Sequence, residues 1–364
     1  MKIKDIISCL ENFAPLSFQE SYDNSGLIIG NTNSEVTSAL ISIDVTEALI
    51  DEAIEKNINL IISHHPIIFN GLKKITGDNY TERLVIKAIK NDIAIYAFHT
   101  NLDYVKDGVN SKICNKLGLK NCKILKPLKN ELKKIVTFVP IQHAEKVRVA
   151  LFNAGAGHIG NYDQCSYNVE GKGTFNALDN TKPFVGKKGE LHYEDEIRIE
   201  TIFPKHLENK IISSLIDVHP YEEVAYDIYQ LDNKYDKAGI GMIGDLENEI
   251  DEKDFLKNIK NIFKTNIVRY TKLLNKKIKK VAVCGGSGSF LLNDAIYKKA
   301  DIFISGDFKY HQFFDANNKI LIADIGHFES EQFTVEIIYE ILKKNLPKFA
   351  AQITKINTNP ITYL

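Results

Sequence analysis

The chain carries no excess of either charge, because 46 lysine and arginine residues stand against 47 aspartate and glutamate residues. This balance gives no bulk electrostatic signal for binding nucleic acid or a membrane surface. The sequence also lacks any uninterrupted run of 18 apolar residues, so we expect no membrane span. Charges interrupt the apolar stretch of residues 1–7, and we therefore expect no signal peptide.

Cysteine is scarce, and its spacing suggests no pairing. The five cysteines are scattered and include no CxxC pair. We predict a reduced compartment, the cytoplasm. Hydrophobic residues make up 44% and charged residues 26% of the chain, which is typical of soluble globular proteins. A length of 364 residues predicts two or three domains.

Near the N-terminus, short apolar runs alternate with amphipathic stretches of helical spacing. The predicted strands are residues 39–44, 60–63 and 93–98, and the predicted helices between them are 46–57 and 81–91. This alternation predicts parallel strands joined by right-handed crossovers.

The C-terminal part of the chain repeats this order. Its predicted strands are residues 280–284, 302–305 and 320–324, and its predicted helices are 290–298, 310–316 and 328–344. We interpret the two segments as related βαβαβ halves of one α/β domain.

The middle of the chain has a different pattern. Strands are predicted at residues 133–140, 196–202 and 225–231, helices at 143–154 and 204–216, with a glycine-rich stretch among them. A β-α-β…β-α-β order is typical of an α+β ferredoxin-like domain. We therefore predict an inserted domain at 129–245, which divides the α/β domain into residues 1–128 and 246–364. Gly239, Gly241 and Gly244 are predicted to form the return hinge.

Histidine and carboxylate side chains stand at the exits of three predicted strands. His64 and His65 follow the strand 60–63, while His99 and Asp103 follow the strand 93–98. His327 follows the strand 320–324, and Glu331 comes four residues later, so both can face one way from a first helical turn. In parallel α/β sheets, ligands gather at the carboxyl ends of the strands.

These nitrogen and oxygen donors suit zinc, manganese, iron, cobalt or nickel, and the pattern leaves the metal open. They outnumber the four ligands of a closed structural zinc site. Adjacent histidines can each bind one of two ions about 3.5–4 Å apart, bridged by a carboxylate and a water. Taken singly, a histidine at a strand end is more often a polar cap, and a His-x-x-x-Glu pair is more often surface decoration. The joint pattern favours a metal site.

Three further segments have two interpretations each. Residues 21–27 could line a site, although the pattern favours a simple turn before a strand. Residues 284–289 could cradle an anion at a helix N-terminus, but a tight connection near the site is the safer interpretation. Asp307 and His311 could orient metal ligands, or Asp307 could cap a helix.

Together these segments resemble the NIF-three-like family, whose members are described as GTP cyclohydrolase 1 type 2 homologues and as dinuclear-metal-centre hexameric proteins. The segments that carry the resemblance are Tyr22-Asp23-Asn24-Ser25-Gly26, Ser63-His64-His65-Pro66, His99-Thr100-Asn101-Leu102-Asp103, Cys284-Gly285-Gly286-Ser287-Gly288, Ser305-Gly306-Asp307 with His311, and Gly326-His327 with Glu331. The match runs along essentially the whole chain, and the insertion resembles the longer bacterial form, whose extra domain is similar to PII and CutA.

The resemblance implies two divalent metal ions per chain. We expect zinc as the first choice, with manganese, iron, cobalt or nickel as alternatives. The implied ligands are His64, His65, Asp103, His327 and Glu331, with Glu331 as the bridge. His99 is implied as an accessory ligand. The resemblance further implies a toroidal homohexamer whose sites face an internal cavity.

The family name implies hydrolysis, in which water activated by the metals opens the imidazole ring of GTP. Attack on a phosphoester or amide bond is equally compatible, so the substrate is a small molecule or a nucleotide. No catalytic side chain is assigned, although His99, Asp307 and His311 could support the water. The alternative is a non-enzymatic, metal-dependent regulatory or interaction hexamer.

Overall fold

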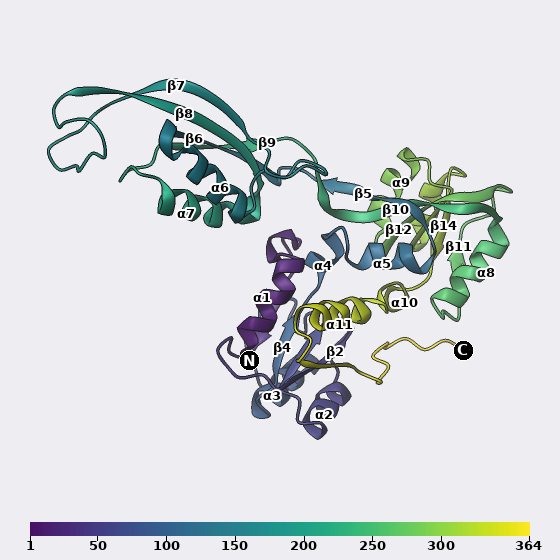
Figure 1. The fold of residues 1–364 in the computed structure, drawn as a ribbon. Helices are drawn as coiled ribbons and strands as arrows, with labels where there is room; N and C mark the ends of the chain where they lie inside the picture. Colours follow the sequence, from purple (N-terminus) through teal and green to yellow (C-terminus); the bar gives the residue numbers. More distant parts are fainter. The chain divides into compact units, whose positions relative to one another are not determined.

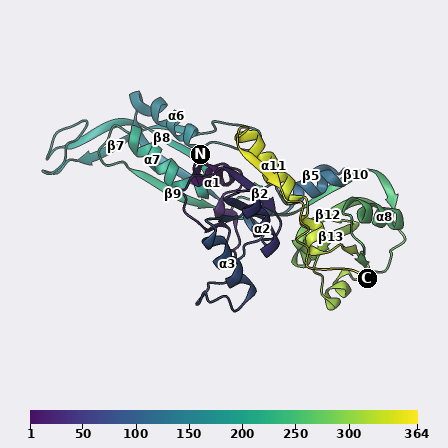
Figure 2. The same cartoon turned by 90° about the horizontal axis from the view of Figure 1, so that it is seen from below.

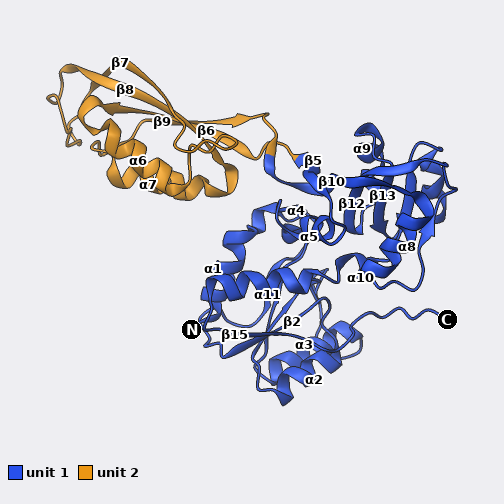
Figure 3. Ribbon diagram, turned by 45° about the vertical axis from the view of Figure 1, so that its right-hand side comes forward, with its two compact units in different colours: residues 1–127, 236–364 blue, residues 128–235 orange.

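A computed structural model describes residues 1–364, which form two compact units (Figure 3). Unit 1 comprises residues 1–127 and 236–364, and unit 2 comprises residues 128–235. The predicted end of the insertion at residue 245 is wrong, because residues 236–245 belong to unit 1. They lie in a strand whose Met242 and Asp245 pair with Val283 and Lys280 of unit 1. Gly239 is packed within unit 1 rather than at a hinge, since a Cβ there would lie 2.4 Å from the carbonyl oxygen of Lys126, which also belongs to unit 1.

The first sheet of unit 1 is built mainly from the predicted N-terminal half. Its strands, in spatial order, are β1 (Gly26–Ile29), β4 (Ala94–Ala97), β3 (Leu60–Ser63), β2 (Ser38–Ser42) and β15 (Ala350–Ile353). The pairs β15–β2, β2–β3 and β3–β4 are parallel, as predicted, and β1 is antiparallel to β4. The C-terminal strand β15 was not predicted.

Side chains alternate between the two faces of the first sheet, and this alternation explains why helices cover both faces. Leu40, Ile61 and Ile95 face one side, where α2 (Glu47–Glu55) and α3 (Tyr80–Lys90) cover them. Their sequence neighbours Ile41 and Ile62 face the other side and pack with α1 (Ile3–Phe13) and α11 (Thr334–Asn345). Figures 1 and 3 show these helix pairs on opposite sides of the sheet. Side chains of period two thus make the sheet a buried central layer.

The second sheet of unit 1 contains the predicted C-terminal half. Its strands, in spatial order, are β11 (Arg269–Tyr270), β14 (Leu321–Asp324), β13 (Ile302–Gly306), β12 (Lys277–Ser287), β10 (Tyr235–Asp251) and β5 (Lys120–Leu128). The pairs β12–β13 and β13–β14 are parallel, as predicted. One face packs on α9 (Leu292–Tyr297) and the turns η4 (Ser289–Leu291) and η5 (Tyr310–Ala316).

Both sheets contribute to a single hydrophobic core. It contains Ile41 of β2, Ile304 of β13 and Ile338 of α11, together with residues of α5 (Val109–Lys116) and α8 (Glu252–Ile262). Figure 2 shows α11 between the purple elements of the first sheet and the green strands of the second. The two sheets are therefore fixed relative to one another within unit 1.

The predicted helix at residues 328–344 is in fact two helices. The short helix α10 (His327–Glu331) follows β14, and α11 begins at Thr334. This interruption lets α10 present its side chains to the strand ends while α11 packs its apolar side in the shared core. Another short helix, α4 (Thr100–Tyr104), follows β4, and the turn η1 (Leu16–Phe18) follows α1.

Unit 2 has its own sheet and core. Its elements are β6 (Leu132–Pro140), η2 (Ile141–His143), α6 (Ala144–Ala154), β7 (Tyr167–Asn176), β8 (Leu191–Pro204), η3 (Lys205–Leu207), α7 (Glu208–Val218) and β9 (Tyr226–Leu231). The strand order is β7-β8-β6-β9, and all pairs are antiparallel. This order agrees with the predicted ferredoxin-like pattern, although β7 lies in the stretch predicted only as glycine-rich. None of the helices in the structure has both the length and the apolar character needed to cross a bilayer.

Candidate metal centre

The predicted ligands come from the carboxyl ends of strands in both sheets of unit 1. His64 and His65 directly follow β3, and Asp103 lies in α4 after β4. His327 and Glu331 are the first and last residues of α10, which follows β14. The structure brings all five together, and their potential ligand atoms form groups whose members lie within 4.8 Å of one another.

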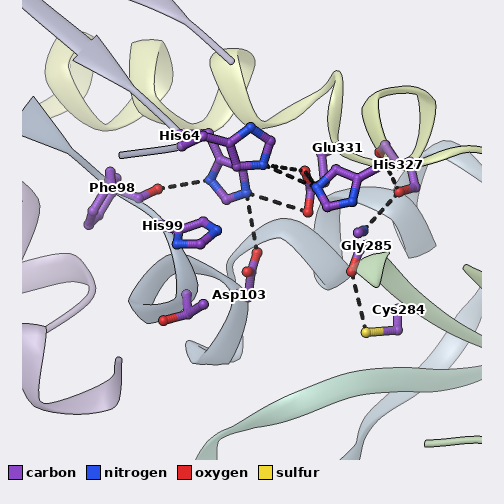
Figure 4. A network of polar contacts seen from close by, with 12 residues as sticks. His64, Phe98, His99, Asp103, Cys284, Gly285, His327 and Glu331 are labelled. Carbon is purple, nitrogen blue, oxygen red and sulfur yellow. Dashed lines mark hydrogen bonds and ion pairs between the residues drawn. The ribbon is translucent and has the colours of Figure 1, made fainter. Parts of the chain in front are cut away.

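One group surrounds His64, which is fully buried (Figure 4). Its Nε2 lies 3.7 Å from Oδ1 of Asp103 and 3.6 Å from Oε1 of Glu331. The buried atoms His64 Nε2 and Asp103 Oδ1 have no hydrogen-bond partner. Orphaned polar atoms are rare in protein interiors and cost free energy. A cation between them would satisfy both, so these residues fit a metal ion.

A second group surrounds the other carboxylate oxygen of Glu331. Oε2 lies 3.0 Å from Nε2 of His65 and 3.1 Å from Nε2 of His327. The two Nε2 atoms lie only 3.2 Å apart. Three nitrogen and oxygen donors therefore converge on one point, as a metal ion requires.

The opposite nitrogen of each histidine is held from behind. Nδ1 of His64 lies 2.9 Å from the Phe98 carbonyl oxygen, and Nδ1 of His65 lies 2.7 Å from Oδ1 of Asp44. Nδ1 of His327 lies 2.7 Å from Oδ2 of Asp307. Such partners fix the orientation of the rings and leave each Nε2 available to a metal ion.

The structure distinguishes the two roles considered for Asp307 and His311, which were orienting metal ligands and, for Asp307, capping a helix. Asp307 orients His327, and the turn η5 begins after Lys309, so Asp307 is not its cap. His311 is exposed and contacts the rings of Tyr310 and Phe314, and it belongs to none of the metal-binding groups.

A third group joins His99 to His64 and His65. Nδ1 of His99 lies 2.6 Å from Oδ1 of Asp23, whose other oxygen accepts from the Ser25 hydroxyl at 2.8 Å. The turn interpretation of residues 21–27 therefore misses their role in holding a site histidine. Asp23 was considered only as part of this segment and of a family motif, without a role of its own, and Asp44 was not predicted at the site. Asp44 had a usable signal, because it follows β2, the parallel neighbour of β3.

The glycine loop after β12 makes room for Glu331. A Cβ at Gly286 would lie 2.2 Å from Oε1 of Glu331. The Gly286 amide donates to the Ser330 hydroxyl and the Gly285 amide to the Asn110 side chain, at 2.8 and 3.0 Å. These two amides are engaged internally and are not available to an anion, which favours the interpretation as a tight connection near the site.

Charge in the cluster favours cations. Burial lowers the pKa of His65, but Asp44 and Glu331 outweigh it and raise that pKa to about 10. Burial likewise lowers the pKa of His327, while Glu331 and Asp307 raise it to about 11. Burial raises the pKa of Glu331, but the facing His64 and His327 hold it well below its usual range. Without an ion, protons on the imidazoles balance the carboxylates.

The fold and the cluster define a mixed α/β protein of several sheets with histidine and carboxylate groups that could bind a metal. The chain belongs to the Duf34/NIF3 (NGG1p interacting factor 3) family, whose model matches residues 1–360. The family predicted from the sequence motifs is thereby confirmed.

Individual relatives cover nearly the whole chain. A Bacillus subtilis protein named GTP cyclohydrolase 1 type 2 homolog is 41% identical over 366 residues, covering 99% of this chain and 98% of the relative. A Staphylococcus epidermidis protein of the same name is 36% identical over 368 residues, covering 100% of both. A solved Bacillus cereus protein related to NIF3 is 41% identical with a TM-score of 0.88, covering 100% of this chain and 99% of that one.

Proposed function

We propose that the chain binds two divalent metal ions at this centre. His64 and Asp103 would hold one ion, His65 and His327 would hold the other, and Glu331 would bridge them. The observation that supports this best is the division of Glu331, whose Oε1 faces His64 while its Oε2 faces His65 and His327. His99 is an accessory ligand in this proposal. Zinc is the first choice, with manganese, iron, cobalt or nickel as alternatives for the same donors.

Metal content tests this centre directly. We expect wild-type protein to carry about two ions per chain by elemental analysis, and Glu331→Gln to lose most of both, because a bridge serves two ions. His158→Ala is the matched control, since His158 is an exposed histidine of unit 2. A single ion per chain, or full metal content in Glu331→Gln, would contradict the dinuclear proposal.

The activity we propose is metal-dependent hydrolysis. Bound divalent ions lower the pKa of water toward neutrality and polarise the bond to be cleaved. The chain's own part is to orient the histidines through Asp44, Asp307 and the Phe98 carbonyl. The name of the relatives supports a nucleotide ring as the target. The engaged amides of the glycine loop give no support for binding the triphosphate, so phosphoesters and amides remain equal candidates.

A substrate panel tests hydrolysis. Purified protein at fixed metal is assayed against GTP, phosphoesters and amides, with chelated protein and His64→Ala as comparisons. Turnover that both chelation and His64→Ala abolish supports a hydrolase. Turnover that persists in either comparison contradicts the assignment.

The second candidate is a non-enzymatic, metal-dependent regulatory or interaction protein. Unit 2 favours it, because it has a separate core and supplies none of the residues of the metal centre. Silence across the substrate panel, with metal content intact, would favour this candidate over the hydrolase.

Assembly and location complete the proposal. We propose a toroidal homohexamer in the cytoplasm, with unit 2 as a module similar to PII and CutA. The mass of the purified protein by light scattering tests the assembly, and six chains per particle is the expected result. A stable monomer or dimer would contradict it.

A further inference from the structure

The segment that follows β15, residues 354–364, contacts the surroundings of the metal centre. The hydroxyl of Thr358 donates to Oδ2 of Asp44 at 3.1 Å. The other oxygen of the same carboxylate, Oδ1, lies 2.7 Å from Nδ1 of His65. Thr358 is only 7% exposed, whereas the side chain of Asp44 is 31% exposed, so the hydroxyl is held in place while the carboxylate still meets solvent. One carboxylate thus connects the C-terminal segment to a proposed metal ligand.

The next residue fixes the same segment to the other half of the centre. The side-chain amide of Asn359 donates to Oε1 of Glu329 at 3.2 Å. Glu329 is buried in α10, between His327 and Glu331. Two consecutive residues of the segment therefore contact Asp44, which follows the first sheet, and α10, which follows the second.

We propose that Thr358 is a positioning residue for the metal centre, and this inference rests on the proposed metal-binding function. Because Thr358 engages one oxygen of Asp44, the carboxylate is held in the rotation that presents its other oxygen to His65. His65 then keeps its Nε2 directed at the site. The partners that orient a metal-ligating histidine typically change metal affinity about 10–100-fold when removed. Thr358 is one hydrogen bond further from the metal than Asp44 is, so we expect its removal to weaken metal affinity less, by about three- to tenfold.

Variants of two threonines distinguish a role of the Thr358 hydroxyl in positioning Asp44 from a role of the Thr358 side chain in packing. Thr358→Val keeps the shape and removes the hydroxyl, whereas Thr358→Ser keeps the hydroxyl and removes the methyl group. Thr354→Val is the matched control, because Thr354 lies in the same segment and its hydroxyl donates to Glu52, outside the centre. The readout is the dissociation constant for zinc, measured by competition with a chromogenic chelator.

We expect Thr358→Val to weaken zinc binding, and Thr358→Ser and Thr354→Val to bind as the wild type does. Weakening by Thr358→Ser with no change in Thr358→Val would assign a packing role and overturn the proposal. Equal affinities of all variants would also overturn it while leaving the metal centre intact. Wild-type protein that binds no zinc would instead remove the proposed function itself.

A double variant tests the route through Asp44. Asp44→Asn leaves a side chain of the same shape with weaker hold on His65. If Thr358 acts through Asp44, adding Thr358→Val to Asp44→Asn changes zinc affinity little further. Effects that multiply fully in the double variant would contradict this route.

Discussion

Gly286 shows how a single residue decides the geometry of the centre. Its φ of 62° lies in the left-handed region, and Glu331 occupies the space that a side chain there would need. The glycine therefore serves both the backbone turn and the position of the carboxylate. Sequence reasoning expected a tight connection near the site, but the pattern of glycines could not reveal which side chain needed the space.

We expect Gly286→Ala to displace Glu331 and to lower metal content well below that of the wild type. Gly118→Ala is the matched control, because Gly118 has a similar φ of 69° but nothing within 4 Å of an added Cβ. Both variants carry the backbone cost of about 1–2 kcal/mol, while only the first disturbs the centre. Elemental analysis of both folded proteins makes the comparison, and equal metal content would argue against this role of Gly286.

We also predict that metal binding releases protons from the site histidines. The raised pKa values of His65 and His327 mean that both rings are protonated near pH 8 in metal-free protein. A metal ion needs neutral imidazoles, so binding should release about two protons per chain. Affinity should therefore rise with pH between 6 and 8.5, because the same protons are released into a solution with fewer free protons to compete for the imidazoles. Calorimetry in buffers of different ionisation enthalpy measures the release, and heats that do not depend on the buffer would refute it.

At the scale of elements, the parallel strands were the best-predicted feature. β2, β3 and β4 pair in parallel, as predicted, and their residues are apolar on both faces, as a covered parallel sheet requires. The break between α10 and α11 was missed. Helical periodicity continues across residues 328–344, and only the position of Glu331 in the folded protein explains why the chain turns there.

The layer formed by α2 predicts a contrast between two of its aliphatic residues. Leu49 is fully buried against the sheet, whereas Ile54 is 37% exposed. Leu49→Ala should lower the free energy of unfolding by about 2–5 kcal/mol, because it leaves a cavity. Ile54→Ala should change it by no more than about 0.5 kcal/mol. Denaturant unfolding at fixed metal tests this, and similar losses in the two variants would contradict the layer assignment.

For the whole molecule, the division into two units separates the candidate metal centre from the insertion. Every residue of the candidate centre lies in unit 1, and unit 2 has its own core of Ile135, Leu151, Phe203 and other apolar residues. A ligand that binds only the folded form stabilises the part of the protein that forms its site.

Metal should accordingly protect the two units unequally. We expect hydrogen exchange to slow on zinc addition in peptides from β3, α4 and α10, and to stay unchanged in peptides from β6 and β8. Glu331→Gln supplies the control, because zinc should have no effect on either unit in that variant. Equal slowing in both units of the wild type would contradict the separation.

Local pattern was enough to foresee the apolar strands, the covering helices and the polar residues at strand exits, because periodicity and chain order are properties of neighbouring residues. It also placed His64, His65, His99, Asp103, His327 and Glu331 at strand exits as candidate ligands, and the family resemblance implied all of these but His99 as the ligand set. The support from Asp23, Asp44, Asp307 and Thr358 depends on approach between residues far apart in the chain. Among these, Asp307 and the segment of residues 21–27 that contains Asp23 were each considered with two interpretations, whereas Asp44 and Thr358 were not considered. Folding brings the exits of two sheets to one point, and that convergence, which no local pattern encodes, sets which oxygen faces which nitrogen.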